Sequence, residues 1–148
     1  MGSNAASLIG NATRPLVVVP ENVKTTQPKK ALLAADFAKD PDPKTYDPLL
    51  DICYSNDTHL SILHVNKPND IHHFTDKDIP FSTEGLEYKL RERVDSDVEY
   101  AIIDFASENE IDLISTVKSK GGFIHDLFHS SLTKKLGMHT ETPLLVLV

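Results

Sequence analysis

The stretch Asp112-Leu-Ile-Ser-Thr-Val-Lys-Ser-Lys-Gly-Gly-Phe-Ile-His-Asp-Leu-Phe-His-Ser-Ser-Leu-Thr-Lys-Lys-Leu136 decides the fold of this chain. It predicts a buried strand over residues 111–117, a Lys/Gly turn over 118–122, and a helix with apolar residues at helical spacing, namely Ile124, Leu127, Phe128, Leu132 and Leu136. In open parallel sheets, the turn after the carboxyl end of a strand is where ligands bind, because backbone N–H groups and the positive end of the helix face an anion there. The stretch therefore predicts a strand-turn-helix unit with a candidate anion site at its turn.

Strands and helices alternate along the rest of the chain. Apolar runs predict strands at residues 31–37, 59–65, 87–94 and 143–148, and charges among the apolar positions of 87–94 mark it as an edge strand. Asp47-Pro48 predicts a helix start with Asp47 as N-cap, and Ser96-Asp97 caps the next helix. This alternation predicts an α/β fold with an open parallel sheet, right-handed crossovers and helices on both faces.

Residues 66–85 are the one long segment without a clear period. They are largely polar and include Pro68, Asn69, Pro80 and Gly85. We expect such a segment to bury little surface and to be mobile.

Two parts of the sequence look like copies of one pattern. Ser3 stands twelve residues before Pro15-Leu-Val-Val-Val19, and Ser131 stands twelve residues before Pro143-Leu-Leu-Val-Leu-Val148. Such a repeat predicts two domains. We expect residues 1–20 to be the last helix and strand of a preceding domain, 21–29 to be a linker, and 30–148 to be one complete domain. The alternative that the first residues are not native stays open.

Composition excludes several classes of function. The chain has 148 residues and a net charge of −7, so it offers no general basic face for nucleic acid. Its single cysteine, Cys53, lies on an apolar helical face and is expected in the core. No apolar run approaches the ~18–20 residues that span a bilayer, and no secretory leader opens the chain. The sequence therefore predicts a cytoplasmic protein with no nucleic-acid or membrane partner.

The order of these elements resembles the universal stress protein family over essentially the whole chain. That family has a Rossmann-like five-stranded parallel sheet, an Asp after the first strand, a His-Val after the second, and a final Pro before a valine-rich strand. Here these features are Asp36, His64-Val65 and the Pro143 to Val148 run. The resemblance implies the C-terminal domain of a tandem member, preceded by the last helix and strand of the first domain.

Many members of the family carry a nucleotide motif after the fourth strand: Gly, two residues, Gly, nine residues, then Gly-Ser or Gly-Thr. Aligned on the terminal strand, the three glycines fall on Val117, Lys120 and Ser130, with Ser131 at the last position. All three glycines are replaced, although the motif needs close approach of bare backbone to phosphate. The resemblance thus implies a degraded nucleotide site at these positions together with Asp36 and Val65.

Other features near this motif leave an alternative open. Lys118, Gly121 and Gly122 form a rearranged Lys/Gly turn that could still hold an anion. Gly2-Ser3 matches the family motif intact, as the remnant of a preceding domain's site.

Metal and catalytic motifs are absent. His125 and His129 have zinc-compatible i, i+4 spacing but no third ligand, and His72-His73 are expected to be surface histidines, so no metal site is predicted. Two hypotheses remain. The first is a non-enzymatic stress-response and dimerisation module without cofactor. The second is a domain that binds ATP or another nucleotide, and weakly hydrolyses it, through the rearranged turn.

The two apolar terminal strands predict an assembly surface. An unpaired apolar edge invites pairing with another strand. We expect the first strand to lie antiparallel against the last, within one chain as a pseudo-dimer or exchanged with a second copy as a homodimer. The interface residues are Leu16, Val17, Val18, Val19, Leu144, Leu145, Val146, Leu147 and Val148.

Overall fold

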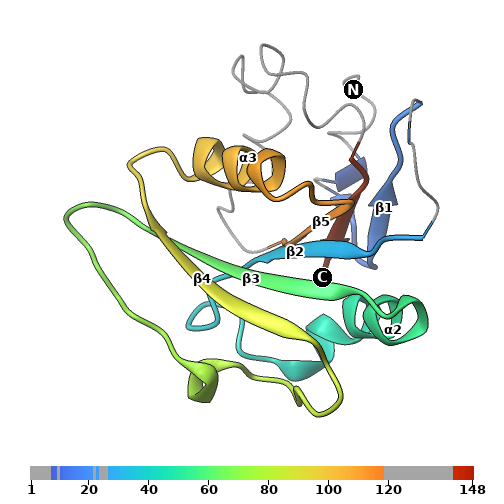
Figure 1. Ribbon diagram of the computed structural model, residues 1–148, viewed down its shortest axis with the longest axis horizontal. Helices are drawn as coiled ribbons and strands as arrows, with labels where there is room; N and C mark the ends of the chain where they lie inside the picture. Colours follow the sequence, from blue (N-terminus) through green and yellow to red (C-terminus); the bar gives the residue numbers. More distant parts are fainter. Residues whose placement is uncertain (1–7, 10, 22, 24–26, 119–141) are drawn as a thin grey trace.

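A computed structural model describes residues 8–9, 11–21, 23, 27–118 and 142–148 of the chain. These residues form a six-stranded sheet in the order β1-β6-β5-β2-β3-β4 (Figure 1). The strands are β1 Leu16–Val18, β2 Lys30–Ala34, β3 His59–Asn66, β4 Tyr88–Val94, β5 Leu113–Val117 and β6 Leu144–Leu147. All five strands predicted within residues 30–148 are therefore present.

The pairing of the strands matches the predicted topology. β2, β3, β4, β5 and β6 are parallel to their neighbours, whereas β1 is antiparallel to β6 with Val17 opposite Leu145. The predicted α/β class and the antiparallel edge strand from the N-terminal segment are confirmed. No helix among the described residues is long and apolar enough to span a membrane.

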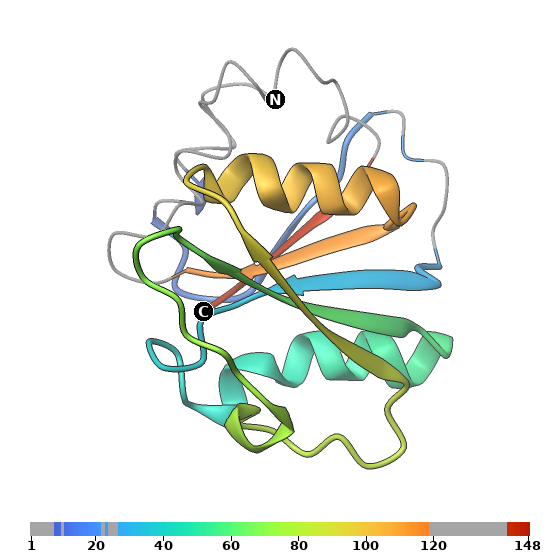
Figure 2. The same cartoon turned by 60° about the vertical axis from the view of Figure 1, so that its left-hand side comes forward.

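Two helices cover opposite faces of the sheet, as Figure 2 shows. α2 (Asp47–Asn56) packs on one face through Leu49, Leu50 and Cys53, and α3 (Val98–Glu108) packs on the other through Ile102, Phe105 and other residues. Successive strand side chains point to alternate faces, which divides the sheet's residues between two cores. Cys53 is 2% exposed, and burial raises the pKa of its thiol to about 11, as expected for an inert core residue.

The start of α2 differs from the prediction. A 3-10 helix, η1 (Pro43–Tyr46), precedes α2, and the side chain of Asp42 accepts a hydrogen bond from the Lys44 N–H at its start. Asp47 is already the first residue of α2, and Tyr46 occupies the cap position without a side-chain bond, so the expectation that Asp47 is the N-cap is wrong. The physical reason is that η1 runs directly into α2, so Asp47 already has helical dihedral angles and cannot adopt the extended conformation of an N-cap.

The start of α3 follows the prediction. Asp97 is the N-cap, and its carboxylate accepts from the Tyr100 N–H at 3.0 Å.

The segment between β3 and β4, residues 67–87, is called the strap below. It contains a short 3-10 helix, η2 (Asp76–Asp78), and buries both Ile79 and Phe81 in the α2-side core. The Phe81 ring lies 5.0 Å from the Tyr46 ring and 6.0 Å from the Phe37 ring, centroid to centroid. The expectation that this segment buries little is therefore wrong, because its few apolar side chains pack at irregular spacing that no periodicity reveals.

The N-terminal segment packs on the α3 face. Leu8, Ile9 and Asn11 are helical, and Ile9 is 3% exposed within the same core as α3. The helix predicted after β5 lies outside the described residues. The division of the chain into a remnant, a linker and a domain stays a prediction.

Candidate functional site

A cleft of about 270 Å³ opens at the carboxyl ends of β2 and β3, beside the start of α3. Two of the predicted site residues line this cleft, namely Asp36 and Val65. In parallel α/β sheets this edge is where ligands bind. The full set of lining residues is Ala34, Ala35, Asp36, Lys39, Leu63, His64, Val65, Asn66, Lys67, Asp70, His72, Val98 and Ile102.

The floor of the cleft is apolar. Ala34 of β2 and Leu63 of β3 lie in the α3-side core, with Val65 packed against it. Val98 and Ile102, one turn apart on α3, complete the floor. The rim, by contrast, is made of charged and polar residues from the end of β3 and from the loops that follow β2 and β3.

Asp36 lies two residues beyond β2 and organises the loop there. Its carboxylate accepts from the Ala38 N–H at 3.1 Å and lies 3.9 Å from the Lys39 ammonium. Its backbone carbonyl accepts from the N–H groups of Lys39 and Asp40, both at 3.0 Å. Burial and the nearby Asp36 charge raise the pKa of Asp40. The Asp36 carboxylate is therefore already partnered by its own loop.

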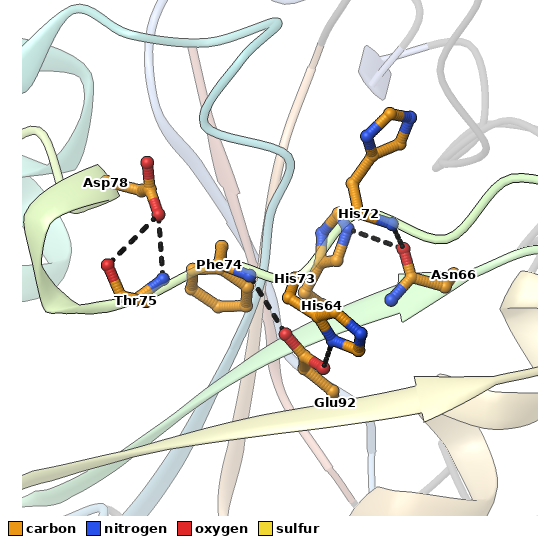
Figure 3. A network of polar contacts seen from close by, with 8 residues as sticks. All are labelled: His64, Asn66, His72, His73, Phe74, Thr75, Asp78 and Glu92. Carbon is orange, nitrogen blue, oxygen red and sulfur yellow. Dashed lines mark hydrogen bonds and ion pairs between the residues drawn. The ribbon is translucent and has the colours of Figure 1, made fainter.

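A polar cluster stands at the end of β3 (Figure 3). The Oδ1 atom of Asn66 accepts from the backbone N–H of His72 at 2.9 Å and lies 3.1 Å from the Nε2 atom of His64. The His72 ring contacts the Asp70 carboxylate at 2.7 Å. Asn66 is only 3% exposed, and its Nδ2 atom has no hydrogen-bond partner in the described part of the chain.

Glu92 of β4 ties the strap to the sheet beside this cluster (Figure 3). Its carboxylate accepts from the Phe74 N–H at 2.9 Å and contacts the Nδ1 atom of His73 at 2.9 Å. The hydrogen bond from His73, followed by the bond from Phe74, lowers the pKa of Glu92. The Phe74 ring also packs edge-on against His64, with ring centroids 5.1 Å apart.

The predicted positions at the end of β5 lie apart from the cleft. Val117 is 6% exposed and packs in the α2-side core. The Lys118 N–H donates to the Leu147 carbonyl at 2.8 Å, and its ammonium donates to the Ala12 carbonyl at 2.9 Å. Neither residue is among those lining the cleft. Thr116, fully buried, has a hydroxyl without a hydrogen-bond partner among the described residues.

The remaining predicted residues lie outside the described part of the chain. They are Gly2, Ser3, Lys120, Gly121, Gly122, His125, His129, Ser130 and Ser131. In the part that the structure describes, no group of three His, Cys, Asp or Glu side chains could hold a metal ion.

Sequence reasoning missed the rim residues at the end of β3 and in the segment after it. Asn66, Lys67, Asp70 and His72 all come after the predicted strand 59–65, at the sheet edge where ligands bind. Their place directly after a predicted parallel strand was the sequence signal that could have identified them. The residues were missed because the segment has no motif and no period.

The second predicted feature, the terminal strands, forms one edge of the sheet. Each of the four residues of β6 is at most 4% exposed, whereas Val17 and Val19 are 48% and 60% exposed. Val17 and Val19 line an apolar groove of about 350 Å³ with residues of α2 and β5. β1 therefore covers β6, while Val17 and Val19 stay exposed beside the groove.

No protein-family model and no curated protein matches the chain by sequence. Solved structures do match. A universal stress protein from Archaeoglobus fulgidus DSM 4304 superposes with a TM-score of 0.70 at 17% identity over 99% of this chain, which spans only 54% of that protein. A universal stress family protein from Burkholderia pseudomallei has a TM-score of 0.55 at 15% identity, over 84% of this chain and 98% of its own. A universal stress protein in complex with cAMP gives 0.55 at 13% identity, over 82% and 98%. At these identities the chain shares the universal stress protein fold.

Proposed function

We propose that this chain is a non-enzymatic universal stress protein-like domain with a degraded nucleotide motif, acting as a stress-response and dimerisation module. The observation that carries the proposal is the burial of Val117. The family resemblance assigns a glycine to this position, yet the valine side chain is 6% exposed and belongs to the core. A phosphate that needs bare backbone at the end of β5 meets a packed strand instead.

The contacts of Lys118 support the same conclusion. Its N–H continues the hydrogen-bond ladder between β5 and β6, so the backbone is still strand-like where the family motif begins. Its ammonium is bound to the Ala12 carbonyl. Neither group is therefore free to cradle an anion as the structure stands.

Isothermal titration of the whole chain with Mg-ATP tests this function. We expect no saturable heat up to about 1 mM nucleotide, which corresponds to less than about 4 kcal/mol of binding free energy. A saturable titration with a micromolar dissociation constant would contradict the proposal. Restoring glycine at Val117, Lys120 and Ser130 together should recover binding if the rest of the pocket survives.

A specific observation favours a second candidate, nucleotide binding in altered geometry. Asp36 and Val65 still line one cleft, and one protein of similar fold was solved in complex with cAMP. The same titration decides between the two candidates, because only the second predicts binding without restored glycines.

For assembly, we propose that β1 and β6 form the contact of a pseudo-dimer within the chain, or of a homodimer when β1 is exchanged. Support comes from their antiparallel pairing and from coverage: the longer Archaeoglobus protein aligns with 99% of this chain, and the Burkholderia protein with 84%. This favours residues 1–20 as the last helix and strand of a first domain in a tandem protein. A cytoplasmic location and the absence of nucleic-acid partners remain predictions.

A further inference from the structure

β6 is enclosed on both edges, and one of its two neighbours is very short. β6 lies between β5 and β1, and each of its residues is at most 4% exposed. β1 contributes only three residues and pairs with no other strand of the described chain. A short edge strand is the kind of element that opens locally before the rest of a fold. The release of β1 would uncover one whole edge of β6.

One side-chain contact ties the chain that enters β1 to the far side of β6. The N–H of Lys118, the residue after β5, donates to the Leu147 carbonyl at 2.8 Å, so the backbone of Lys118 is fixed against β6. Its ammonium donates to the Ala12 carbonyl at 2.9 Å in a partly buried position. Ala12 lies shortly before Leu16, the first residue of β1, which pairs with Val146. The contact between Lys118 and Ala12 therefore spans the carboxyl end of β6, and it is called the latch below.

Few other contacts hold the N-terminal segment in place. Ile9 is 3% exposed and packs in the α3-side core. Val17 and Val19, by contrast, are 48% and 60% exposed, so β1 gains little from burying these two side chains. The latch has a charged donor, which makes its hydrogen bond stronger than one between two neutral groups. We therefore expect the latch to contribute a large share of the stability of the docked β1.

The edge of β6 is complementary to a second copy of itself. Pro15-Leu-Val-Val-Val19 repeats the pattern of Pro143-Leu-Leu-Val-Leu147, so Val17 is the counterpart of Leu145 in the repeat. In the structure Val17 also lies opposite Leu145. The flanking pairs are Leu16 with Val146 and Val18 with Leu144. β1 therefore pairs with β6 as a second β6 strand would pair across a two-fold axis, with Leu145 opposite its own counterpart.

The opposite edge of the sheet does not offer the same fit. β4 carries Lys89, Arg91 and Arg93 at alternate positions, which lie on one face of the sheet. Two antiparallel copies of β4 that met near Arg91 would bring these cations opposite one another, and like charges directly opposite are unfavourable. A second copy of the chain is therefore directed to β6.

We propose that the latch between Lys118 and Ala12 keeps β1 on β6, and that opening the latch lets the β6 strand of a second copy take the place of β1. This inference rests on the proposed dimerisation function, and it adds the partner strand, its register and the contact that controls access to it. It differs from an exchange of β1, because β1 leaves the sheet in both copies. In the closed chain, β1 competes at an effective concentration on the order of millimolar, so the wild type should be monomeric at micromolar concentrations.

Hydrogen exchange of the 15N-labelled full chain, followed by nuclear magnetic resonance at low protein concentration, tests the latch. Lys118→Met removes the ammonium and keeps the apolar stem, so the amide protons that β1 donates to β6 should exchange about tenfold faster. Lys118→Arg keeps a cationic donor and should stay close to the wild type. Lys89→Met, at an exposed lysine of β4, is the matched control and should leave the exchange of β1 unchanged.

Sedimentation and cysteine cross-linking test the partner strand. Lys118→Met should form dimers at concentrations at which the wild type is monomeric. Leu145→Cys in that variant, with Cys53→Ala, should give a disulfide-linked dimer under oxidised glutathione, because directly opposite side chains are close enough for a disulfide. Leu144→Cys is the matched control and should cross-link far less, because in this register it lies opposite the second copy's Val146.

Three outcomes overturn the proposal. They are β1 exchange that is unchanged in Lys118→Met, faster exchange without a dimer, and cross-linking through residue 144 as readily as through residue 145. If Leu145→Cys does not fold, sedimentation of Lys118→Met still decides whether opening produces a dimer. Deletion of residues 1–20 separates this inference from the proposed dimerisation. A deletion variant that self-associates while Lys118→Met stays closed overturns the latch alone, whereas a monomeric deletion variant overturns the proposed dimerisation as well.

Discussion

At one edge of the sheet, the three residues of β1 pair antiparallel with β6, whereas at the other edge β4 pairs with β3 alone and carries charged residues at four of its seven positions. The first edge is held by backbone pairing and apolar burial, with Leu16, Val18 and Ile9 packed on the α3 side. The second edge is held by ion pairs and by the strap. Arg93 of β4 donates to Asp104 and Glu108 of α3, and Glu92 binds the strap.

This difference predicts how the stability of each edge responds to pH and salt concentration. Apolar burial depends weakly on pH and salt, whereas exposed charge pairs are screened by salt and lost on protonation. Charged side chains also discourage pairing with another chain, which an apolar edge without cover invites. The β1–β6 edge should therefore control association, and the β4 edge should show the larger response to solvent conditions.

The largest expected effect comes from deleting residues 1–20. This removes β1 and Ile9, costs about 3–6 kcal/mol of apolar burial, and uncovers β6, whose residues are all buried. We expect concentration-dependent self-association or precipitation, measured by light scattering. Deleting only residues 1–7 keeps β1 and is the control. A stable, monodisperse monomer after the longer deletion would contradict the role given to this edge.

The next effect concerns the strap. Phe81→Ala removes a ring that is 8% exposed between Phe37 and Tyr46, so we expect a loss of about 3 kcal/mol in the free energy of unfolding. Urea denaturation followed by circular dichroism measures it. Ile71→Ala, at a strap side chain that is 41% exposed, should change stability by less than about 0.5 kcal/mol. Equal effects of the two substitutions would mean that the strap adds nothing to the core.

The same contrast between regular and irregular segments explains what the sequence could predict. β2, β3, β5 and β6 are short apolar runs of strand length bounded by polar or turn residues, and that combination indicates buried strands. β1 was predictable because Pro15 and the aliphatic residues after it repeat the pattern at Pro143.

Irregular segments were not predictable in this way. Ile79 and Phe81 are buried in one core with Tyr46 and Phe37, which lie far from them in the sequence. Asp36 and Val65 line one cleft because each stands at the carboxyl end of a parallel strand, a position that the apolar runs reveal. Asn66 was missed because the decisive fact about it, a donor without an acceptor, exists only in three dimensions.

A smaller effect on stability is expected from the two ion pairs of Arg93. The guanidinium binds Asp104 at 2.9 Å and Glu108, and its carbon lies 5.1 Å from the centre of the Phe105 ring. Arg93→Met keeps much of the apolar contact and removes the charge, so it should cost about 1 kcal/mol at low salt. The loss should shrink in about 1 M NaCl, because salt screens the pairs.

Urea midpoints at the two salt concentrations measure the Arg93 effect. Arg91→Met, at an exposed arginine of β4 without an ion pair among the described residues, is the matched control and should change little. A loss for Arg93→Met that does not depend on salt would show that packing on Phe105, and not charge, holds this edge.

The smallest expected effect, and the most specific to the β4 edge, is the pH response of Glu92. Its bonds from His73 and Phe74 lower its pKa below the ordinary value of 4.5, so the folded state favours the ionised carboxylate. A depressed folded-state pKa contributes stability that is fully present above about pH 4.5 and is lost as the pH falls through the folded-state value. Glu92→Gln removes this contribution while keeping the shape of the side chain.

We therefore expect Glu92→Gln to be less stable than wild type at about pH 7, with a difference that narrows towards about pH 3, because protonation removes the same charge from the wild type as the pH falls through the folded-state pKa. Urea midpoints across this range measure the convergence. Glu84→Gln, at an exposed strap carboxylate without an ion pair in the described ranges, should match the wild type at both pH values. If the difference between Glu92→Gln and wild type stays constant down to pH 3, then the two hydrogen bonds hold the strap without the charge, and the β4 edge resembles the β1–β6 edge more than its composition indicates.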